Sequence, residues 1–238
     1  PARYLGILRR VEPVGPPTPI DDEDCEPPVP DYSTCVARAV AVTYTRLDPD
    51  DPADGLARQL LARAACCAPG EPVPPWLLTK ALTAVAEDAA SVPNTTVAAP
   101  DTGPAFQAAV ATAYRRLHEL GLLATSVDGE PLLPPLLSSA LPLDDGALDG
   151  VERALLYAVT DWKSALNRAE KLPAMPPWLG HLVYVTDRAF WRYDTYAALL
   201  THHLGHLLRR AGDLSSARHY LAESVAIWWE SQGTYLTT

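Results

Sequence analysis

Apolar residues near the end of the chain recur with the spacing of two consecutive helices. The first helix begins near Tyr196, and its apolar stripe consists of Leu200, Leu204, Leu207 and Leu208. Gly212-Asp213 ends this helix, because glycine adopts the left-handed C′ conformation at the least cost. Ser215 or Ser216 can cap the second helix, whose predicted stripe consists of Ala217, Leu221, Val225 and Trp228. Gly205 and Ala217 are small, so we expect the two helices to pack closely as an antiparallel hairpin.

The same helical spacing extends over most of the remaining chain. It predicts a short helix over residues 3–10 and longer ones over 32–47, 56–68, 76–90, 105–120, 147–172 and 178–190. For residues 32–47 a strand is the competing interpretation, because several of these side chains are β-branched. Asp128-Gly129 lies between two apolar runs, which is typical of a tight β-hairpin. The predicted fold class is therefore mainly α, with one small β-hairpin.

Charge along the chain is acidic and uneven. The 238 residues carry a net charge of −10, and residues 1–55 alone hold 11 acidic and 5 basic side chains. Residues 11–31 are rich in proline and include the run from Asp21 to Asp24, which we interpret as a solvated surface; docking of a partner is the alternative. No segment is basic, so attraction to nucleic acid or to an anionic membrane is not expected.

Other features of the composition bear on the compartment. No apolar run reaches 18 residues and no signal peptide is visible, so we expect a cytoplasmic protein without a membrane partner. The cysteines form no C-x-x-C pair and are interpreted as small buried or half-buried thiols in a reducing compartment: Cys25, Cys35, Cys66 and Cys67. A Cys25–Cys35 bridge is geometrically possible but not favoured. The start at Pro1 and the single methionine, Met175, favour a fragment of a longer protein; a product whose initiator methionine was removed is the alternative.

The last two helices resemble one tetratricopeptide repeat. The matching residues are Leu204-Gly205, Leu208, Gly212-Asp213, Ala217 and Leu221. Together with the stretches DYSTCVARAVAVTYTRL, LARQLLARAACCAPGEPVPPWLL and YRRLHELGLLATSVDGEPLLPPLL, nearly the whole chain resembles the C-terminal part of STAND-type signalling ATPases, the NB-ARC class of bacterial switch proteins. This resemblance implies a proline-rich acidic segment with a lid-like helix (residues 1–55), a winged-helix-like domain (56–141), and a helical connector with a tetratricopeptide-type repeat (142–238).

The resemblance also bears on nucleotides. In that family an upstream P-loop domain binds ATP or ADP, but this sequence contains no G-x-x-x-x-G-K-[ST] motif. We therefore expect this chain neither to bind nor to hydrolyse nucleotide, and to need no cofactor. Family members often place a histidine at the end of the wing, where it contacts the nucleotide phosphate. Here that place is taken by Pro134-Pro135, which offers no side-chain donor and no backbone N–H, and this departure argues against nucleotide sensing by the wing.

A candidate binding surface lies on the first helix of the predicted hairpin. The face away from its leucine stripe carries Leu199, His202, His206 and Arg209. The resemblance places this face in the concave groove of the repeat, where these side chains can hydrogen-bond a partner segment; simple solvent exposure is the alternative. 

The same helix contains an H-H-x-x-H run, in which His202 and His206 lie one turn apart and can share a metal. His203 replaces the glutamate of the zinc motif H-E-x-x-H, however, and no nearby third ligand is evident, although His181 and His219 exist. We predict no metal site. Aromatic residues crowd the C-terminal half, and most are expected in the core or in contacts between repeats. Of the adjacent Trp228 and Trp229, one is expected to pack inward and the other to meet a further repeat or a partner.

No catalytic constellation stands out, so the chain is predicted not to be an enzyme. We expect a regulatory, protein-binding part of a STAND-type switch, whose winged helix packs on a nucleotide domain and whose repeats sense a protein or peptide partner. The first alternative is a stand-alone tetratricopeptide adaptor. A second is a transcription regulator that uses Arg115, Arg116 and His118, although Glu119 and the acidic wing at 126–130 oppose DNA. A third is a metal-dependent enzyme around His202 and His206.

Overall fold

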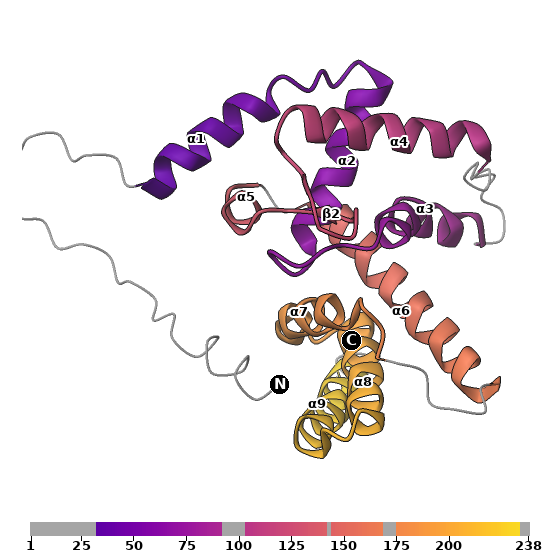
Figure 1. Ribbon diagram of the computed structural model, residues 1–238. Coiled ribbons are helices and arrows are strands. Elements are labelled where there is room, and N and C mark those ends of the chain that lie inside the picture. Colours follow the sequence, from indigo (N-terminus) through magenta and orange to yellow (C-terminus); the bar gives the residue numbers. More distant parts are fainter. Residues whose placement is uncertain (1–31, 92–102, 142–143, 169–174, 234–238) are drawn as a thin grey trace, which may run out of the picture. The chain divides into compact units, whose positions relative to one another are not determined.

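The computed structural model describes residues 32–91, 103–141, 144–168 and 175–233. Within these ranges the chain is mainly helical and contains a two-stranded antiparallel sheet (Figure 1), which confirms the predicted fold class at this level. The predicted helix over residues 3–10, the acidic run and Cys25 lie outside the described residues, as does the side chain of Cys35.

The helices have the following bounds along the chain: α1 Tyr32–Tyr44, α2 Pro52–Cys66, α3 Pro75–Ser91, α4 Pro104–Glu119, α5 Pro135–Ala140, α6 Asp145–Arg168, α7 Leu179–Ala189, α8 Thr195–Arg210 and α9 Leu214–Gly233. The strands β1 (Ala124–Thr125) and β2 (Pro131–Leu132) follow α4, and the 3-10 helix η1 (Phe190–Arg192) follows α7 directly. Helix α2 packs against α3, α4, α5 and α6, whereas α8 packs against α6, α7 and α9.

The first two helices differ from expectation only at their ends. Residues 32–44 are helical, so the strand alternative for this segment is wrong. Asp51 accepts hydrogen bonds from the backbone N–H groups of Ala53 and Asp54 at 2.8 and 3.0 Å, and Pro52 takes the first helical position. There the N–H that proline lacks would have no helical partner anyway. Helix α2 therefore begins at Pro52, before its predicted start near Leu56.

The predicted hairpin is present and is followed directly by a short helix. Ala124 pairs with Leu132 and Thr125 with Pro131 across a turn in which Gly129 has a φ of 82°. Past the second strand, Pro134 caps α5, which the sequence did not predict. Proline fixes a φ that suits the first turn of a helix, so the same residues that break a helix further along can also start one.

Helices α3 and α6 approach each other closely at Gly150. A Cβ atom built on Gly150 would lie 2.4 Å from the carbonyl oxygen of Ala81 in α3, so only hydrogen fits at this position. The same carbonyl accepts a 3.0 Å hydrogen bond from Nε of Arg63, a buried residue of α2. Three helices are thus joined around one backbone carbonyl.

Helices α8 and α9 form a closely packed antiparallel pair, as predicted (Figure 1). A Cβ atom on Gly205 would lie 2.7 Å from Cγ of Leu221 and 3.1 Å from its backbone nitrogen. The small residue therefore sets the distance between the two helices. Gly212 ends α8 with a φ of 84°, in the left-handed conformation that the sequence predicts.

Two expectations for α9 are wrong. Its N-terminus is capped by Asp213, whose Oδ1 accepts the N–H of Ser216 at 3.0 Å, and not by Ser215 or Ser216. Its buried face consists of Ala217, Tyr220, Ser224 and Ile227. Val225 and Trp228 of the predicted stripe are exposed, and so is Trp229, so neither tryptophan packs inward. The helix carries apolar residues on more than one side, and periodicity alone selected the wrong side.

Helix α7 is tied to the loop after α2 by a buried histidine. Nδ1 of His181 accepts the N–H of Ala68 at 3.1 Å, and Nε2 lies 2.9 Å from the carbonyl oxygen of Pro72. One ring nitrogen therefore accepts and the other donates, which requires the neutral imidazole with its proton on Nε2. Burial lowers the pKa of His181, which favours the same neutral form.

We expect this histidine to make the protein less stable in mild acid. Its pKa is 6.5 when exposed in the unfolded chain and lower in the folded one, so the unfolded state binds the proton first as the pH falls. Its contribution to folding is complete above pH 6.5 and is lost below it, by at most about 1.4 kcal/mol per pH unit. Urea unfolding at pH 8 and pH 5 measures the loss. In His181→Asn the difference between the two pH values should shrink; an unchanged difference would assign the effect to other groups.

None of the helices in the described ranges combines the length and the apolar character that a bilayer span requires.

Candidate functional site

The four residues of the predicted binding surface share one side of α8. On this side Leu199, His202 and Arg209 are exposed and His206 is half-buried. On the other side Leu200, Leu204 and Leu207 are buried and Leu208 is half-buried. The imidazole rings of His202 and His206 lie edge to face, with centroids 4.5 Å apart. We call these four side chains the α8 face; that it binds a partner stays a prediction.

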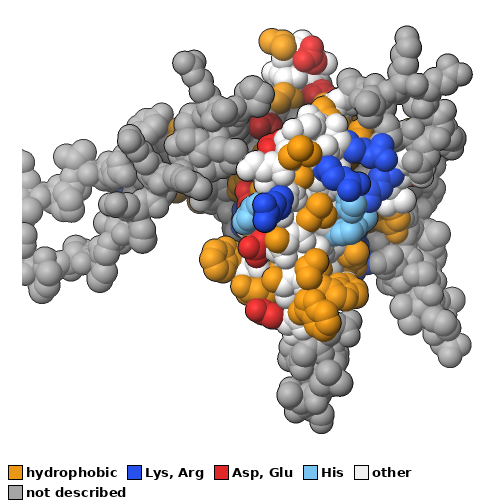
Figure 2. Space-filling view, turned by 90° about the horizontal axis from the view of Figure 1, so that it is seen from below, with side chains coloured by type: hydrophobic (Ala, Val, Ile, Leu, Met, Phe, Trp, Pro, Cys, Tyr) orange, Lys and Arg blue, Asp and Glu red, His pale blue; other side chains and the backbone are white. Residues whose placement is uncertain are grey.

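Lys163 of α6 adds positive charge next to this face. Its Nζ lies 2.7 Å from Nδ1 of His203, so the ammonium group donates to a neutral imidazole. Burial and the charge of Lys163 lower the pKa of His203 to about 4, and the same two causes lower the pKa of His202. Figure 2 shows histidines beside lysine and arginine side chains on the face drawn there, with hydrophobic side chains around them. The α8 histidines therefore offer neutral hydrogen-bonding nitrogens in a positive local field.

This geometry does not suit a cation. Among the described residues, no group of three His, Cys, Asp or Glu side chains is arranged to hold a metal ion. Nδ1 of His203 is already engaged by Lys163, whose ammonium group would repel a second cation. The H-H-x-x-H run therefore supplies at most His202 and His206 as a pair, without the third protein ligand of a zinc site.

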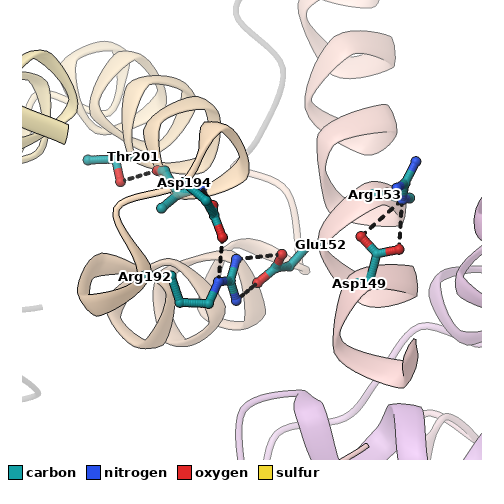
Figure 3. A network of polar contacts seen from close by, with 7 residues as sticks. Asp149, Glu152, Arg153, Arg192, Asp194 and Thr201 are labelled. Carbon is teal, nitrogen blue, oxygen red and sulfur yellow. Dashed lines mark hydrogen bonds and ion pairs between the residues drawn. The ribbon is translucent and has the colours of Figure 1, made fainter. Parts of the chain in front are cut away.

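A partly buried ion-pair network, in which Glu152 is the buried member, joins α6 to the start of α8 (Figure 3). Both oxygens of Glu152 accept hydrogen bonds from the guanidinium group of Arg192, at 2.7 and 2.8 Å. Nε of Arg192 donates to Asp194 at 2.7 Å, and the other oxygen of Asp194 caps α8 by accepting the N–H of Ala197. Burial raises the pKa of Glu152, and the hydrogen bonds from Arg192 act against that rise.

Sequence reasoning did not find this network. Glu152 and Arg192 are separated by 40 positions, so no local spacing connects them. The available signal was the pair Arg192 and Asp194, two residues apart at the predicted start of a helix, where an aspartate is a good cap. That signal predicts the cap but not its link to α6.

The residues proposed for DNA contact on α4 are partly engaged within the protein. Nε of Arg116 donates to Asp54 of α2 at 3.1 Å, and Arg115 donates to Thr112 of its own helix. The hydrogen bond from the backbone of Asp48, followed by that from Arg116, lowers the pKa of Asp54, so the pair is charged at neutral pH. The basic side chains of α4 thus serve at least partly to hold α2 and α4 together.

The two described cysteines are free thiols inside the core. Cys66 and Cys67 are both buried, as the sequence suggested, and they form no disulfide. Burial raises the pKa of Cys66 to about 11 and also raises the pKa of Cys67. A thiol of this kind holds almost no thiolate at neutral pH, so neither residue has the character of a nucleophile.

Comparison with protein-family models, curated proteins and solved structures gives no significant match to this chain. The resemblance to STAND-type ATPases stays a prediction.

Proposed function

We propose that this chain is a regulatory, protein-binding part of a STAND-type nucleotide-dependent switch and is itself not an enzyme. In this proposal the α8 face binds a protein or peptide partner. The observation that carries it is the asymmetry of α8: one side is buried against neighbouring helices, and the other presents Leu199, His202, His206 and Arg209 together. Recognition of a partner requires accessible side chains. Binding costs less when a buried scaffold already holds such side chains in position.

The order of elements supports the winged-helix part of this proposal. Helices α2, α3 and α4 are followed by the hairpin β1–β2, and Pro72, between α2 and α3, forms an isolated bridge with Leu132 of β2. A winged helix consists of three helices with a small sheet of this kind. Residues 56–141 would form this domain, with the lid-like helix before it and the connector and tetratricopeptide-type repeat over residues 142–238.

Contacts between the two modules suggest how a signal would pass. His181 hydrogen-bonds the loop after α2, and the Glu71 carboxylate of the same loop lies against Gly180 in the first turn of α7. That position suits a negative charge, because the N-terminus of a helix carries partial positive charge. A partner bound to the α8 face would bias the packing of α7 and α8 on this loop and so the packing of the winged helix on a nucleotide domain.

The charge near the α8 face indicates the chemistry of the partner. His202 and His206 are neutral at pH 7, because burial lowers the pKa of both. The positive charges near them come from Lys163, Arg209 and Arg210. An acidic or carboxylate-bearing segment would gain from the positive field, and the imidazoles would add directed hydrogen bonds.

The test uses a phage-displayed library of random peptides, selected on the immobilised protein at pH 7.5. We expect acidic peptides to be enriched, and the double variant His202→Ala/Arg209→Glu to bind them at least about tenfold more weakly, because it removes a hydrogen bond and reverses a charge. Arg218→Glu, an exposed charge reversal on α9, is the control and should bind normally. If the selected peptides bind both variants equally, the α8 face is not the binding site.

The non-catalytic part of the proposal predicts no heat of binding when ATP is titrated into the chain at micromolar concentration. Pro134 and Pro135 hold the start of α5, in the place where the resemblance would put a phosphate-reading histidine. This observation also favours the alternative of a stand-alone adaptor that uses the same α8 face. A Walker motif in the reading frame upstream of Pro1 would decide for the switch. For a transcription regulator, a mobility shift at low salt would be needed.

A further inference from the structure

A second candidate site lies on η1 and α9, away from the residues of the α8 face. It is a pocket of about 210 Å³ lined by Phe190, Trp191, Tyr193, His219, Glu223 and Ile227. Trp191 and Tyr193 are unusually exposed for their types, at 82% and 45%. Three aromatic rings and one carboxylate therefore converge on a space large enough for one side chain.

The aromatic wall is held rigidly from behind. The ring of Phe190 stacks on Tyr220 with centroids 5.7 Å apart, and the hydroxyl of Tyr220 donates to Asp187 at 2.7 Å. Arg192 and Asp194, on either side of Tyr193, belong to the network with Glu152. The segment that carries Trp191 and Tyr193 is thus held by these stacking and ion-pair contacts, although the two rings themselves face solvent.

Tyr193 shows that this arrangement is imposed on the chain. Its φ is 51°, and among the described residues no other residue except glycine has a positive φ. A bulky side chain in this region of backbone space is disfavoured and persists only where the surroundings hold it. Strain of this kind, next to exposed aromatic rings, is typical of a binding site.

The charge of the pocket indicates a cationic occupant. Glu223 is half-buried and forms no ion pair in the part of the chain that the structure describes. No lysine or arginine lines the pocket. The faces of aromatic rings attract ammonium and guanidinium groups, and a nearby carboxylate adds to this attraction.

We propose that this pocket binds the side chain of a lysine or arginine from a partner polypeptide. The alkyl stem would lie against the rings of Trp191 and Tyr193, and the charged end would meet Glu223. The proposal does not depend on the function proposed for the α8 face, because none of the four residues of that face lines the pocket.

The experiment follows the Trp191 indole N–H by NMR while short peptides are added at pH 8. The probes are acetyl-Gly-Lys-Gly-amide, its trimethyl-lysine form, and its norleucine form, which keeps the alkyl stem without the charge. We expect saturable shifts with both cationic peptides, tighter binding of the trimethylated one, and at least about tenfold weaker binding of the norleucine peptide. Equal binding of norleucine, or no shift at millimolar peptide, would overturn the proposal.

Substitutions of residues that line the pocket test whether the peptides bind there. Trp191→Ala and Glu223→Gln should each weaken binding of the lysine peptide by about three- to tenfold, read from the Tyr193 and Ile227 signals. Trp229→Ala removes another exposed tryptophan, on α9 and outside the pocket, and should leave binding unchanged. Because Trp191 is exposed, its loss should not unfold the protein, and an unchanged melting temperature verifies this. If tetramethylammonium alone binds as tightly as the trimethylated peptide, the assignment to a polypeptide partner is wrong.

Discussion

Arg192→Met is expected to lower the free energy of unfolding by about 3 kcal/mol, the largest loss among the single substitutions considered. The variant leaves the Glu152 carboxylate, whose side chain is 2% exposed, without its counter-ion. Removal of one partner of a buried pair typically costs about 3–5 kcal/mol, and the lower end applies because the Arg192 side chain keeps 33% exposure. Urea unfolding followed by far-UV circular dichroism at pH 7.5 measures the loss, with Arg218→Met as a surface control.

Two further measurements identify the unpaired carboxylate as the cause. In Arg192→Met, burial without the arginine should leave the pKa of Glu152 above its value of 4.5 in the unfolded chain. The folded state then binds the proton more readily, so the deficit should shrink as the pH falls toward 4.5. The double variant Arg192→Met/Glu152→Leu should recover most of the stability, since an apolar pair can replace a buried ion pair. A deficit that persists in the double variant would point to lost packing instead.

Gly150→Ala is expected to destabilise the protein by about 1–3 kcal/mol, because the new methyl group would lie 2.4 Å from the Ala81 carbonyl oxygen. That oxygen belongs to the backbone of α3 and also binds Arg63, so it cannot move aside as a side chain would. Either α3 and α6 separate or the Arg63 hydrogen bond breaks. Both outcomes expose apolar surface or leave a buried polar group unsatisfied.

Gly146→Ala in the same helix is the matched control. A Cβ atom there would lie 3.5 Å from Asp144 Oδ1, which is ordinary contact, so the substitution should stabilise the protein by about 0.4–1 kcal/mol. The two variants make the same change in one helix, but the methyl group meets the backbone of α3 at position 150 and makes only ordinary contact at position 146. Chemical denaturation at pH 7.5 separates them; equal effects would show that α3 and α6 are not in close contact in solution.

The sequence predicts most helices of this protein because their apolar residues recur with the helical period. It also predicts the turns at Gly129 and Gly212, since each requires a positive φ that glycine adopts easily. The prediction fails where the local sequence is compatible with two structures. No helix was predicted at Pro135, which begins α5, and Val225 was placed in the core although Ser224 and Ile227 are buried instead.

Of the candidate sites, the sequence predicts only the one whose residues all lie on a single helix. The α8 face was predictable because its four residues lie on one helix, and helical spacing alone places them on one side. The pocket at η1 and the pair Glu152–Arg192 bring together residues from separate elements. No local sequence pattern encodes contacts of this kind, because they depend on how α6, α8 and α9 pack together.

The neighbouring thiols of Cys66 and Cys67 have a consequence for how the protein ages. While α2 stays packed, both sulfurs are shielded and protonated, so oxidants and alkylating agents find no thiolate to attack. Each opening of α2 exposes two adjacent reactive groups at once. Damage at these positions therefore requires that α2 opens first, so mutations that loosen the packing of α2 should also speed oxidation of the two thiols.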